Sequence, residues 1–410
     1  MKQLFKILFS LFLILWIALL LYVNIRLGFL PELEITPDGV VNQDVLHQLY
    51  FLKKELHKNQ AGEQMQQLYP EGLLFINSLY ALTWYDLVKD LKYSSPYYKE
   101  AIQEIDWVLQ RVQSDEARSI FSESLEIEYG AFYTGWSNLI LGRKLLLLKP
   151  VDRSADDIRL FKSKCEHIAG FIKDSDTPFA TSYANQAWPA DMVICVTSLP
   201  MYDHLFEPKY QYVTRQWIKK VQQRLDTVTG LIPHSVHAQT GYPEEGARGS
   251  SQSLINCFLP EIDPVFANNQ FLHYKQFFLD RRLGLPGIRE YPEGEFGIGD
   301  IDSGPVIWGI GGAASVVGLR VMSIHNESDV AVGLRNSIEG FGAGWTSGDQ
   351  KKYLFGVLPI ADAFIAWANS GPAIKASMLP DWRRDFLIYS TLTSLAIYPL
   401  LYWMWRKSTR

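Results

Sequence analysis

The alternation of two kinds of helical stretch is the strongest constraint on the fold of this chain. About twelve stretches carry apolar residues at the helical period or on a continuous face. Their approximate bounds are 42–59, 71–91, 96–113, 129–148, 155–174, 187–206, 209–227, 249–261, 264–283, 303–324, 327–341 and 354–369. The first, third, fifth, seventh and ninth carry regular charge and should face solvent. The even-numbered stretches are apolar almost all round, which is typical of buried helices.

Outer and inner helices joined in sequence predict an all-α fold, an (α/α)6 toroid in which helical hairpins close into a ring. An α-solenoid is the alternative, but the chain has no repeat of fixed period. Few runs alternate with period two, so we expect no substantial sheet. Residues 231–236 could form one short extended piece.

Both ends of the chain are hydrophobic enough to suggest membrane helices. Residues 7–25 are nearly all apolar, follow Lys2 and Lys6, and have about the length that ~30 Å of hydrocarbon requires. A cleaved signal peptide is the alternative, but the run is longer than the usual apolar core and no small-residue cleavage motif follows it. A second span is expected over 386–405, where Pro399 and several hydroxyl residues weaken the signal.

These ends divide the chain into three parts. We expect an N-terminal transmembrane anchor at 1–26, a toroid at 27–385, and a second transmembrane helix with a basic tail at 386–410. Basic residues precede the first span and follow the second, which puts both termini in the cytoplasm. The toroid should then face the periplasm or the exterior, and the membrane is the first expected partner.

Charge and metal-ligand spacing exclude several classes of protein. The chain has 39 basic and 44 acidic residues and no basic run in its body, so nucleic acid is not an expected partner. Its three cysteines lack the spacing of a zinc site or a disulfide framework. His234 and His237 have no third ligand nearby, so we expect no metal. The glycine-rich run 309–314 lies inside an apolar helical stretch with no strand before it, so we expect no dinucleotide or other cofactor.

The polar motifs of the chain mostly precede its inner helices. In a toroid these helices run parallel, so their amino ends meet at one rim, where free N–H groups suit a polar or anionic ligand. We expect the functional site at this rim. The candidates for catalysis are Asp191, Glu245 and Asp302. The candidates for substrate binding are Trp188, Glu71, Glu128, Tyr129, His234, Glu244, Arg248, Ser250, Gln252, Asp300 and Asp349.

Each of these motifs also has a purely structural interpretation. Asp300 and Asp302 could cap the tenth stretch. Arg248 could pair with a nearby carboxylate and hold its loop in place. Trp188 could belong to the core. The Tyr-Pro-Glu-Gly runs at 69–72 and 291–294 could be turns made by proline and glycine.

Residues 230–318 contain motifs that resemble a group of largely uncharacterised bacterial envelope proteins. They are Gly-Leu-Ile-Pro-His-Ser, Gly-Ala-Arg-Gly-Ser-Ser-Gln-Ser, Leu-Gly-Leu-Pro-Gly-Ile-Arg-Glu-Tyr-Pro and Gly-Asp-Ile-Asp-Ser-Gly-Pro-Val-Ile, together with Trp-Pro-Ala-Asp at 188–191. The resemblance implies a protein of the bacterial inner membrane. The architecture is also similar to that of six-hairpin glycosidases and of the toroidal domain of linalool dehydratase-isomerase. The catalytic residues of neither family align one by one with this chain, so none is carried over.

Three functions fit these features. The first is a membrane-anchored enzyme acting on an envelope glycan or glycolipid, with Asp191, Glu245 and Asp302 as candidate acid and base and Trp188 as a platform for the sugar. The second is a lyase or isomerase for an apolar alcohol, which needs a deep aromatic-lined pocket. The third is a non-catalytic toroid that binds a glycan, a lipid or a protein. The sequence carries no signal of its oligomeric state.

Overall fold

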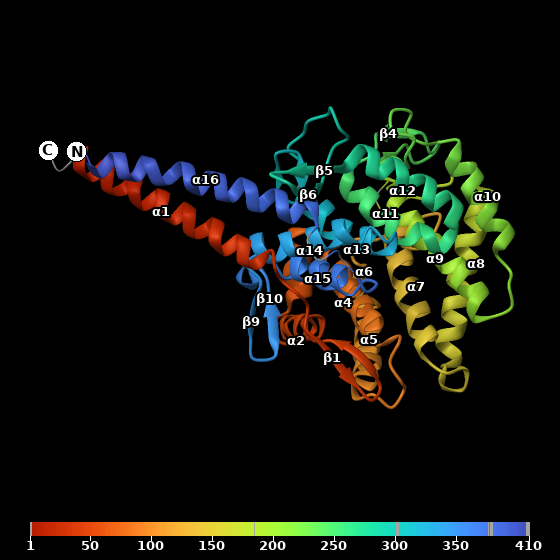
Figure 1. Ribbon diagram of the computed structural model, residues 1–410. Coiled ribbons are helices and arrows are strands. Elements are labelled where there is room, and N and C mark those ends of the chain that lie inside the picture. The colour runs from red at the N-terminus through yellow and green to blue at the C-terminus, as the bar shows by residue number, and fades with distance from the viewer. Residues whose placement is uncertain (1, 184, 301–302, 376, 378–379, 407–410) are drawn as a thin grey trace.

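Six helices form a closed inner ring in the computed structural model (Figure 1), which describes all residues except 1, 184, 301–302, 376, 378–379 and 407–410. They are α4 (Gly72–Val88), α7 (Gly130–Leu147), α9 (Pro189–Leu205), α11 (Gly249–Ile262), α13 (Gly312–Ile324) and α15 (Pro359–Asn369). Each packs against the next, and α15 packs against α4. Because these helices are apolar on nearly every side, they are most stable where all of their faces are covered.

A second layer of helices surrounds this ring. It consists of α2 (Gln43–Lys58), α5 (Pro96–Val112), α8 (Ala155–Asp174), α10 (Gln211–Gln222), α12 (Pro264–Phe278) and α14 (Ser328–Phe341). Each outer helix packs on an inner neighbour, and α2 packs on both α15 and α4. In α5, for example, Ala101, Ile105 and Val108 are buried at helical spacing. The predicted all-α (α/α)6 toroid is confirmed.

Short elements connect the two layers. Those that are helical are α3 (Ala61–Leu68), α6 (Asp115–Arg118) and the 3-10 turns Pro150–Asp152 and Leu354–Gly356. The described residues also form five antiparallel hairpins: β1 (Leu33–Thr36) with β2 (Gly39–Asn42), β3 (Ser235–Val236) with β4 (Pro243–Glu245), β5 (Leu279–Arg282) with β6 (Leu285–Ile288), β7 (Val306–Ile307) with β8 (Ile310–Gly311), and β9 (Trp345–Ser347) with β10 (Gln350–Lys352). No strand in the described part of the chain joins a larger sheet, as predicted.

Two predicted helical stretches are wrong at one end. Residues 279–283 belong to the β5–β6 hairpin, and 306–311 form the β7–β8 hairpin, so α13 begins only at Gly312. The turns of these hairpins, Leu283–Gly284 and Trp308–Gly309, have positive φ values between 50° and 85° at both residues. Two successive residues of positive φ are typical of tight hairpin turns with glycine second. This local turn chemistry overrides the apolar pattern.

The two terminal helices, α1 (Lys2–Arg26) and α16 (Asp381–Arg406), pack against each other and extend together away from the toroid (Figure 1). Both are long and apolar enough to cross a membrane, and little of either is buried in the protein. α16 begins a few residues before the expected start of the second span at 386. Nδ2 of Asn24 donates a 3.0 Å hydrogen bond to Oγ of Ser390, which joins the two helices.

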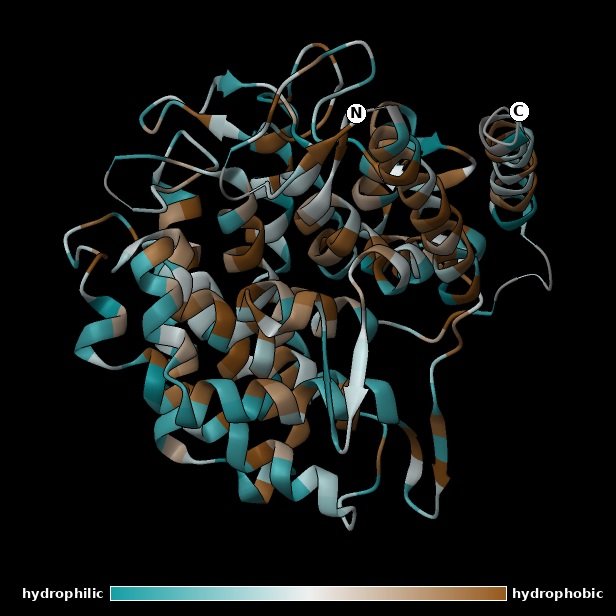
Figure 2. Ribbon diagram, turned by 90° about the vertical axis from the view of Figure 1, so that its left-hand side faces the viewer, coloured by the Kyte–Doolittle hydropathy of each residue, from teal (hydrophilic) through white to brown (hydrophobic). Residues whose placement is uncertain are grey.

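The inner ends of the terminal helices are anchored in the body. A small separate core there contains Val23, Leu27, Leu285, Val332, Trp382 and Phe386. Arg383 of α16 also donates a 2.6 Å hydrogen bond from Nη2 to the carbonyl oxygen of Asn24. Figure 2, which views the molecule from the side that the two helices leave, shows them standing at one edge of the body. Their orientation relative to the toroid is therefore set by side-chain packing.

The first residue of α7 is expected to tolerate no side chain. Gly130 has a φ of +81°, and a Cβ there would lie 2.0 Å from the carbonyl oxygen of Ser182. We expect Gly130→Ala to destabilise the fold by roughly 2–5 kcal/mol, because backbone strain and overpacking add. Thermal unfolding of the full-length protein in detergent, followed by circular dichroism, measures this effect.

Gly170, inside α8, is the matched control. A Cβ there meets nothing within 4 Å. Since alanine is the better helix former, Gly170→Ala should stabilise by up to about 1 kcal/mol. Equal effects at the two positions would contradict the close approach at Gly130.

Candidate functional site

The amino ends of the inner helices gather at one rim of the ring. An outer helix separates each inner helix from the next, so the inner helices run in the same direction. The loops that lead into α9 and α11 touch each other there, since the backbone N–H of Val236 donates a 3.1 Å hydrogen bond to the carbonyl oxygen of Ala187. Two polar clusters lie along this rim, one at the start of α9 and one at the start of α11.

The first cluster pairs Asp191, in the first turn of α9, with Glu71, which precedes α4. Asp191 is only 6% exposed. Burial raises the pKa of Asp191 to about 7; a hydrogen bond with Ser182 opposes this rise, and the Glu71 carboxylate lies close enough to add to it. Asp191 therefore keeps its proton up to about neutral pH, beside a second carboxyl group.

Aromatic rings lie within a helical turn of both carboxyl groups. Trp188, three residues before Asp191, stacks on Tyr183 with ring centroids 5.0 Å apart and planes inclined by 29°. Phe75, one turn after Glu71, meets a ring of α15, Phe364, edge-on at 4.9 Å. Trp188, Tyr183, Phe75 and Phe364 are all half-buried. Their partly exposed, weakly polar faces offer a surface on which an apolar or sugar ring could lie.

The second cluster centres on Arg248, which precedes α11 and is buried. Nε and Nη2 of Arg248 both lie 3.0 Å from Oε1 of Glu290, and Nη1 lies 2.6 Å from Oδ2 of Asp300. Oγ of Ser250 donates a 2.8 Å hydrogen bond to the same Glu290 oxygen. Although burial opposes it, the hydrogen bond from Arg248 lowers the pKa of Asp300 to about 2. We call Arg248, Glu290, Asp300, Ser250 and His234 the Arg248 cluster.

His234 completes the Arg248 cluster. Its Nδ1 hydrogen-bonds with Oγ of Ser251, and its Nε2 lies 3.4 Å from both Nη1 of Arg248 and Oε2 of Glu245. Burial, together with the nearby Arg248 charge, lowers the pKa of His234 to about 4. The imidazole is therefore neutral at physiological pH, with one nitrogen able to donate and the other able to accept.

Glu290 is a member of this cluster that the sequence interpretation missed. It is fully buried, burial raises its pKa, and its Oε2 has no hydrogen-bond partner among the residues that the structure describes. The adjacent 291–294 run predicted only a turn. A stronger signal was available, because two charged residues, Arg289 and Glu290, directly follow the apolar strand at 285–288. Gly249 lets α11 approach this strand end, since a Cβ there would lie 1.8 Å from the carbonyl oxygen of Arg289.

The residues predicted around Arg248 have different environments. Glu244 and Glu245 lie on β4, which is exposed along its length, and Glu245 contacts the cluster at His234. Gln252 is fully buried, and its Nε2 donates to the carbonyl oxygen of Ile232, so it serves the packing of α11. The third carboxylate predicted as catalytic, Asp302, lies outside the described residues.

Three further candidates are not joined to either cluster by a described contact. Glu128 is exposed. Tyr129 adjoins α7 with a φ of 62° and donates its hydroxyl to Glu123. Asp349 lies in the exposed turn of the β9–β10 hairpin, which packs on α2. The structure places Asp349 on the outside of the ring instead of over its centre, because Lys351 ties β10 to the first turn of α2.

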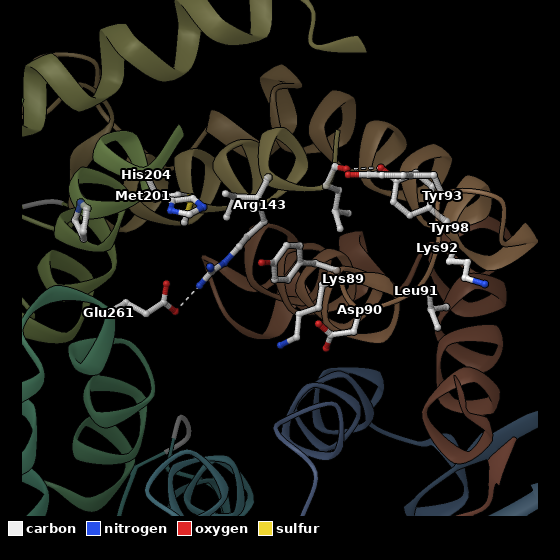
Figure 3. Close-up of a pocket in the computed structure, with 14 residues that line it drawn as sticks. Lys89, Asp90, Leu91, Lys92, Tyr93, Tyr98, Arg143, Met201, His204 and Glu261 are labelled. Atoms are coloured by element: carbon white, nitrogen blue, oxygen red, sulfur yellow. Dashed lines mark hydrogen bonds and ion pairs between the residues drawn. The ribbon is translucent and has the colours of Figure 1, made fainter. Parts of the chain in front are cut away.

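A cavity of about 670 Å³ lies at the opposite rim, at the carboxyl ends of α4, α7, α9 and α11 (Figure 3). An ion pair between Arg143 and Glu261, 2.5 Å long, lines it. Three buried rings come from alternate inner helices, and Phe258 contacts both of the others, with centroids 6.1 Å from Trp136 and 5.7 Å from Trp367. They fill the centre of the ring, so this cavity is separate from the rim that holds the carboxyl clusters.

Asp191 and Asp362, in the first turn of α15, should make the stability of the protein depend on pH. Burial raises the pKa of both to about 7, above the unfolded value near 4. Between about pH 4 and pH 7 the folded state keeps protons that the unfolded state has released, so stability falls as pH rises through this window. Asp191→Asn removes one such group.

The unfolding free energy of Asp191→Asn minus that of the wild type should therefore rise by roughly 3–4 kcal/mol between pH 4 and pH 8. Denaturant unfolding at several pH values measures this difference. A difference that stays constant with pH would contradict the raised pKa.

Comparisons with known proteins relate the chain to solved structures. Neither a protein-family model nor a curated protein matches its sequence. It is similar to the crystal structure of an unsaturated glucuronyl hydrolase specific for heparin, with 9% sequence identity, a TM-score of 0.46, and coverage of 92% of this chain and 98% of that one. The fold assignment rests on the helix packing described above, and no residue role is transferred from that enzyme.

Proposed function

We propose that this protein is a membrane-anchored enzyme that cleaves a glycosidic bond of an envelope glycan or glycolipid, with Asp191 as the general acid. The observation that carries this proposal is the environment of Asp191, a buried carboxyl group with a pKa of about 7 beside Glu71. Most glycosidases use two carboxyl groups, one protonated and one ionised, on the two sides of the scissile bond.

The two carboxyl groups have distinct proposed roles. Asp191 donates its proton to the glycosidic oxygen as the bond to the anomeric carbon breaks. Glu71 either attacks that carbon or takes a proton from the attacking water, and the separation of the two groups in the substrate complex decides between them. Trp188 supplies the ring face on which the sugar lies.

The Arg248 cluster supports substrate binding in this proposal. Its ion pairs, of which the one with Glu290 is buried, hold the loops at 290 and 300 against the start of α11. The exposed Glu245, which lies 3.4 Å from the neutral His234, is then the hydrogen-bonding group for sugar hydroxyls. We assign Glu245 to contact instead of catalysis, because its side chain is 59% exposed and water would compete for it.

The terminal helices support a location in the envelope. α1 and α16 are long and apolar, and basic residues lie at the amino end of α1 and, in the sequence, at the carboxyl end of α16 and after it. The positive-inside rule then puts both termini in the cytoplasm and the toroid in the periplasm of a bacterial inner membrane. A glycan or glycolipid of that compartment is the expected substrate.

A panel assay tests the proposed reaction. The full-length protein in nanodiscs is incubated with peptidoglycan fragments, O-antigen polysaccharides, membrane glycolipids and prenyl alcohols, and the products are identified by mass spectrometry. Release of a reducing sugar from one class supports the proposal. Binding of a glycan without turnover would instead support a non-catalytic toroid, and turnover of prenyl alcohols alone would support a lyase or isomerase.

Activity should decline on the alkaline side. Because Asp191 must carry its proton to act as an acid, kcat/KM should fall as pH rises through about 7. A pH profile of the active substrate, measured from pH 5 to pH 9, checks this expectation. An activity that rises through pH 7 would contradict the role of Asp191.

A further inference from the structure

We propose that the body of the protein rests on the bilayer surface through two apolar patches that flank the terminal helices. This inference depends on α1 and α16 crossing the membrane, which is part of the proposed function. The α1 patch consists of Phe341, Trp345, Leu354, Phe355 and Val357, and the α16 patch consists of Leu283, Ile307 and Trp308. All eight side chains are exposed.

The α1 patch lies beside the point where α1 enters the body. Arg26, the last residue of α1, pairs with Glu339 and donates a 2.9 Å hydrogen bond from Nη2 to the carbonyl oxygen of Gly344. Trp345 follows Gly344 directly and is 64% exposed. The backbone N–H of Leu354 bonds to the carbonyl oxygen of Gly342, which brings Phe355 to the same place.

The α16 patch lies at the start of α16. The β5–β6 turn meets that helix closely, since a Cβ on Gly284 would lie 2.7 Å from Cβ of Asp385. Nε of Arg282 donates a 3.0 Å hydrogen bond to the carbonyl oxygen of Trp308, which joins the β5–β6 hairpin to the β7–β8 turn. Trp308 is 69% exposed. In Figure 1, the β5–β6 and β9–β10 hairpins lie on the same side of the body as the departing helices.

The composition of the patches fits the membrane–water interface. Isolated exposed apolar side chains are common in soluble proteins, but large contiguous apolar patches mark interaction surfaces. Tryptophan is enriched where headgroups meet hydrocarbon, because its ring is apolar and its N–H is polar. Each patch contains one exposed tryptophan and adjoins a helix that is long and apolar enough to span the bilayer. Each patch therefore continues the apolar surface of a helix that spans the bilayer, and the bilayer is the partner that we assign to both patches.

This contact would also place the candidate site close to lipid. The carbonyl oxygen of Gly309, beside Trp308, accepts a 3.1 Å hydrogen bond from the backbone N–H of Glu290. Gly311 of the same hairpin faces Oε2 of Glu290. The hairpin that carries Trp308 toward the headgroups therefore also contacts Glu290 of the Arg248 cluster. A glycan attached to a membrane lipid is the substrate class that this arrangement favours.

Quenching by spin-labelled lipids tests the surface on the full-length protein. The three native cysteines are buried, so single cysteines introduced at Trp308 and Trp345 can be labelled selectively with a fluorophore. Tyr212 on α10 and Val265 on α12 are exposed to a similar extent and serve as matched control positions. In nanodiscs of phosphatidylcholine and phosphatidylglycerol, with a nitroxide near the headgroup, quenching should be several-fold stronger at Trp308→Cys and Trp345→Cys than at the controls.

A label on α1 tests separately whether the terminal helices cross the membrane. Leu11→Cys, on the exposed face of α1, should be quenched by a nitroxide placed deep in the acyl chain. Strong quenching at Leu11 with equal, weak quenching at the four surface positions would overturn the docking surface alone. Absence of quenching at Leu11 would overturn the spans and the docking surface together. Neither quenching measurement depends on catalysis, so a failure of the proposed reaction would appear in the substrate panel and leave both quenching results unchanged.

Discussion

Asp191→Asn should lower the turnover of a natural glycan substrate by about 10²–10⁴-fold while the fold survives, because the variant cannot donate a proton to the leaving oxygen. Asparagine keeps the shape of the side chain and can still bond to Ser182. Measuring kcat with the full-length protein in nanodiscs, beside its circular dichroism spectrum, tests this result. An aryl glycoside whose leaving group needs no proton should restore most of the lost turnover, which a purely structural defect would not allow.

Asp362→Asn is the matched control for this experiment. Asp362 also lies in the first turn of an inner helix, is 2% exposed, and has a pKa that burial raises to about 7. However, it accepts a 2.7 Å hydrogen bond from the backbone N–H of Tyr353 and so serves the chain that leads into α15. The turnover of the Asp362→Asn variant should stay close to that of the wild type. Equal losses in the two variants would show that any buried carboxyl group of the ring affects activity, and the assignment of Asp191 would fail.

Arg248→Met should cause the largest loss of stability among single substitutions at the site, on the order of 3–5 kcal/mol. The variant leaves Glu290 fully buried without its cationic partner, and Oε2 of Glu290 has no hydrogen bond among the described residues even in the wild type. The loss should be greater at pH 8 than at pH 5, because protonation relieves a buried carboxylate that has lost its partner. Unfolding in denaturant at both pH values measures the effect.

Two companion variants make this result specific. Arg159→Met removes an ion pair with Asp156 in which both side chains are more than three-quarters exposed, so it should change stability by less than about 1 kcal/mol. The double variant Arg248→Met with Glu290→Met replaces the buried pair by apolar groups and should recover much of the lost stability. A double variant that is no more stable than Arg248→Met would show that the loss does not come from the stranded Glu290.

Much of the fold could be predicted from the sequence because helix formation and burial leave a local pattern. The charged and apolar stretches correspond to outer and inner helices, and the residue spans of α8 and α5 agree with prediction to within one residue. The errors came from short-range turn chemistry. At Leu283–Gly284 and Trp308–Gly309, two residues of positive φ form hairpin turns inside stretches whose composition resembles a helix.

The sequence by itself determined that polar motifs precede the inner helices, and hence that a site would lie at their amino ends. Only the tertiary structure decided which of these motifs meet. It brought Asp191 close to Glu71, added the buried Glu290 to Arg248 and Asp300, and left Asp349 on the outside beside α2. The physical reason is one of range. Helical periodicity involves residues that are close in the sequence, so it can be recognised in the sequence itself. Contacts between side chains of different hairpins depend on ring closure and on the path of each loop.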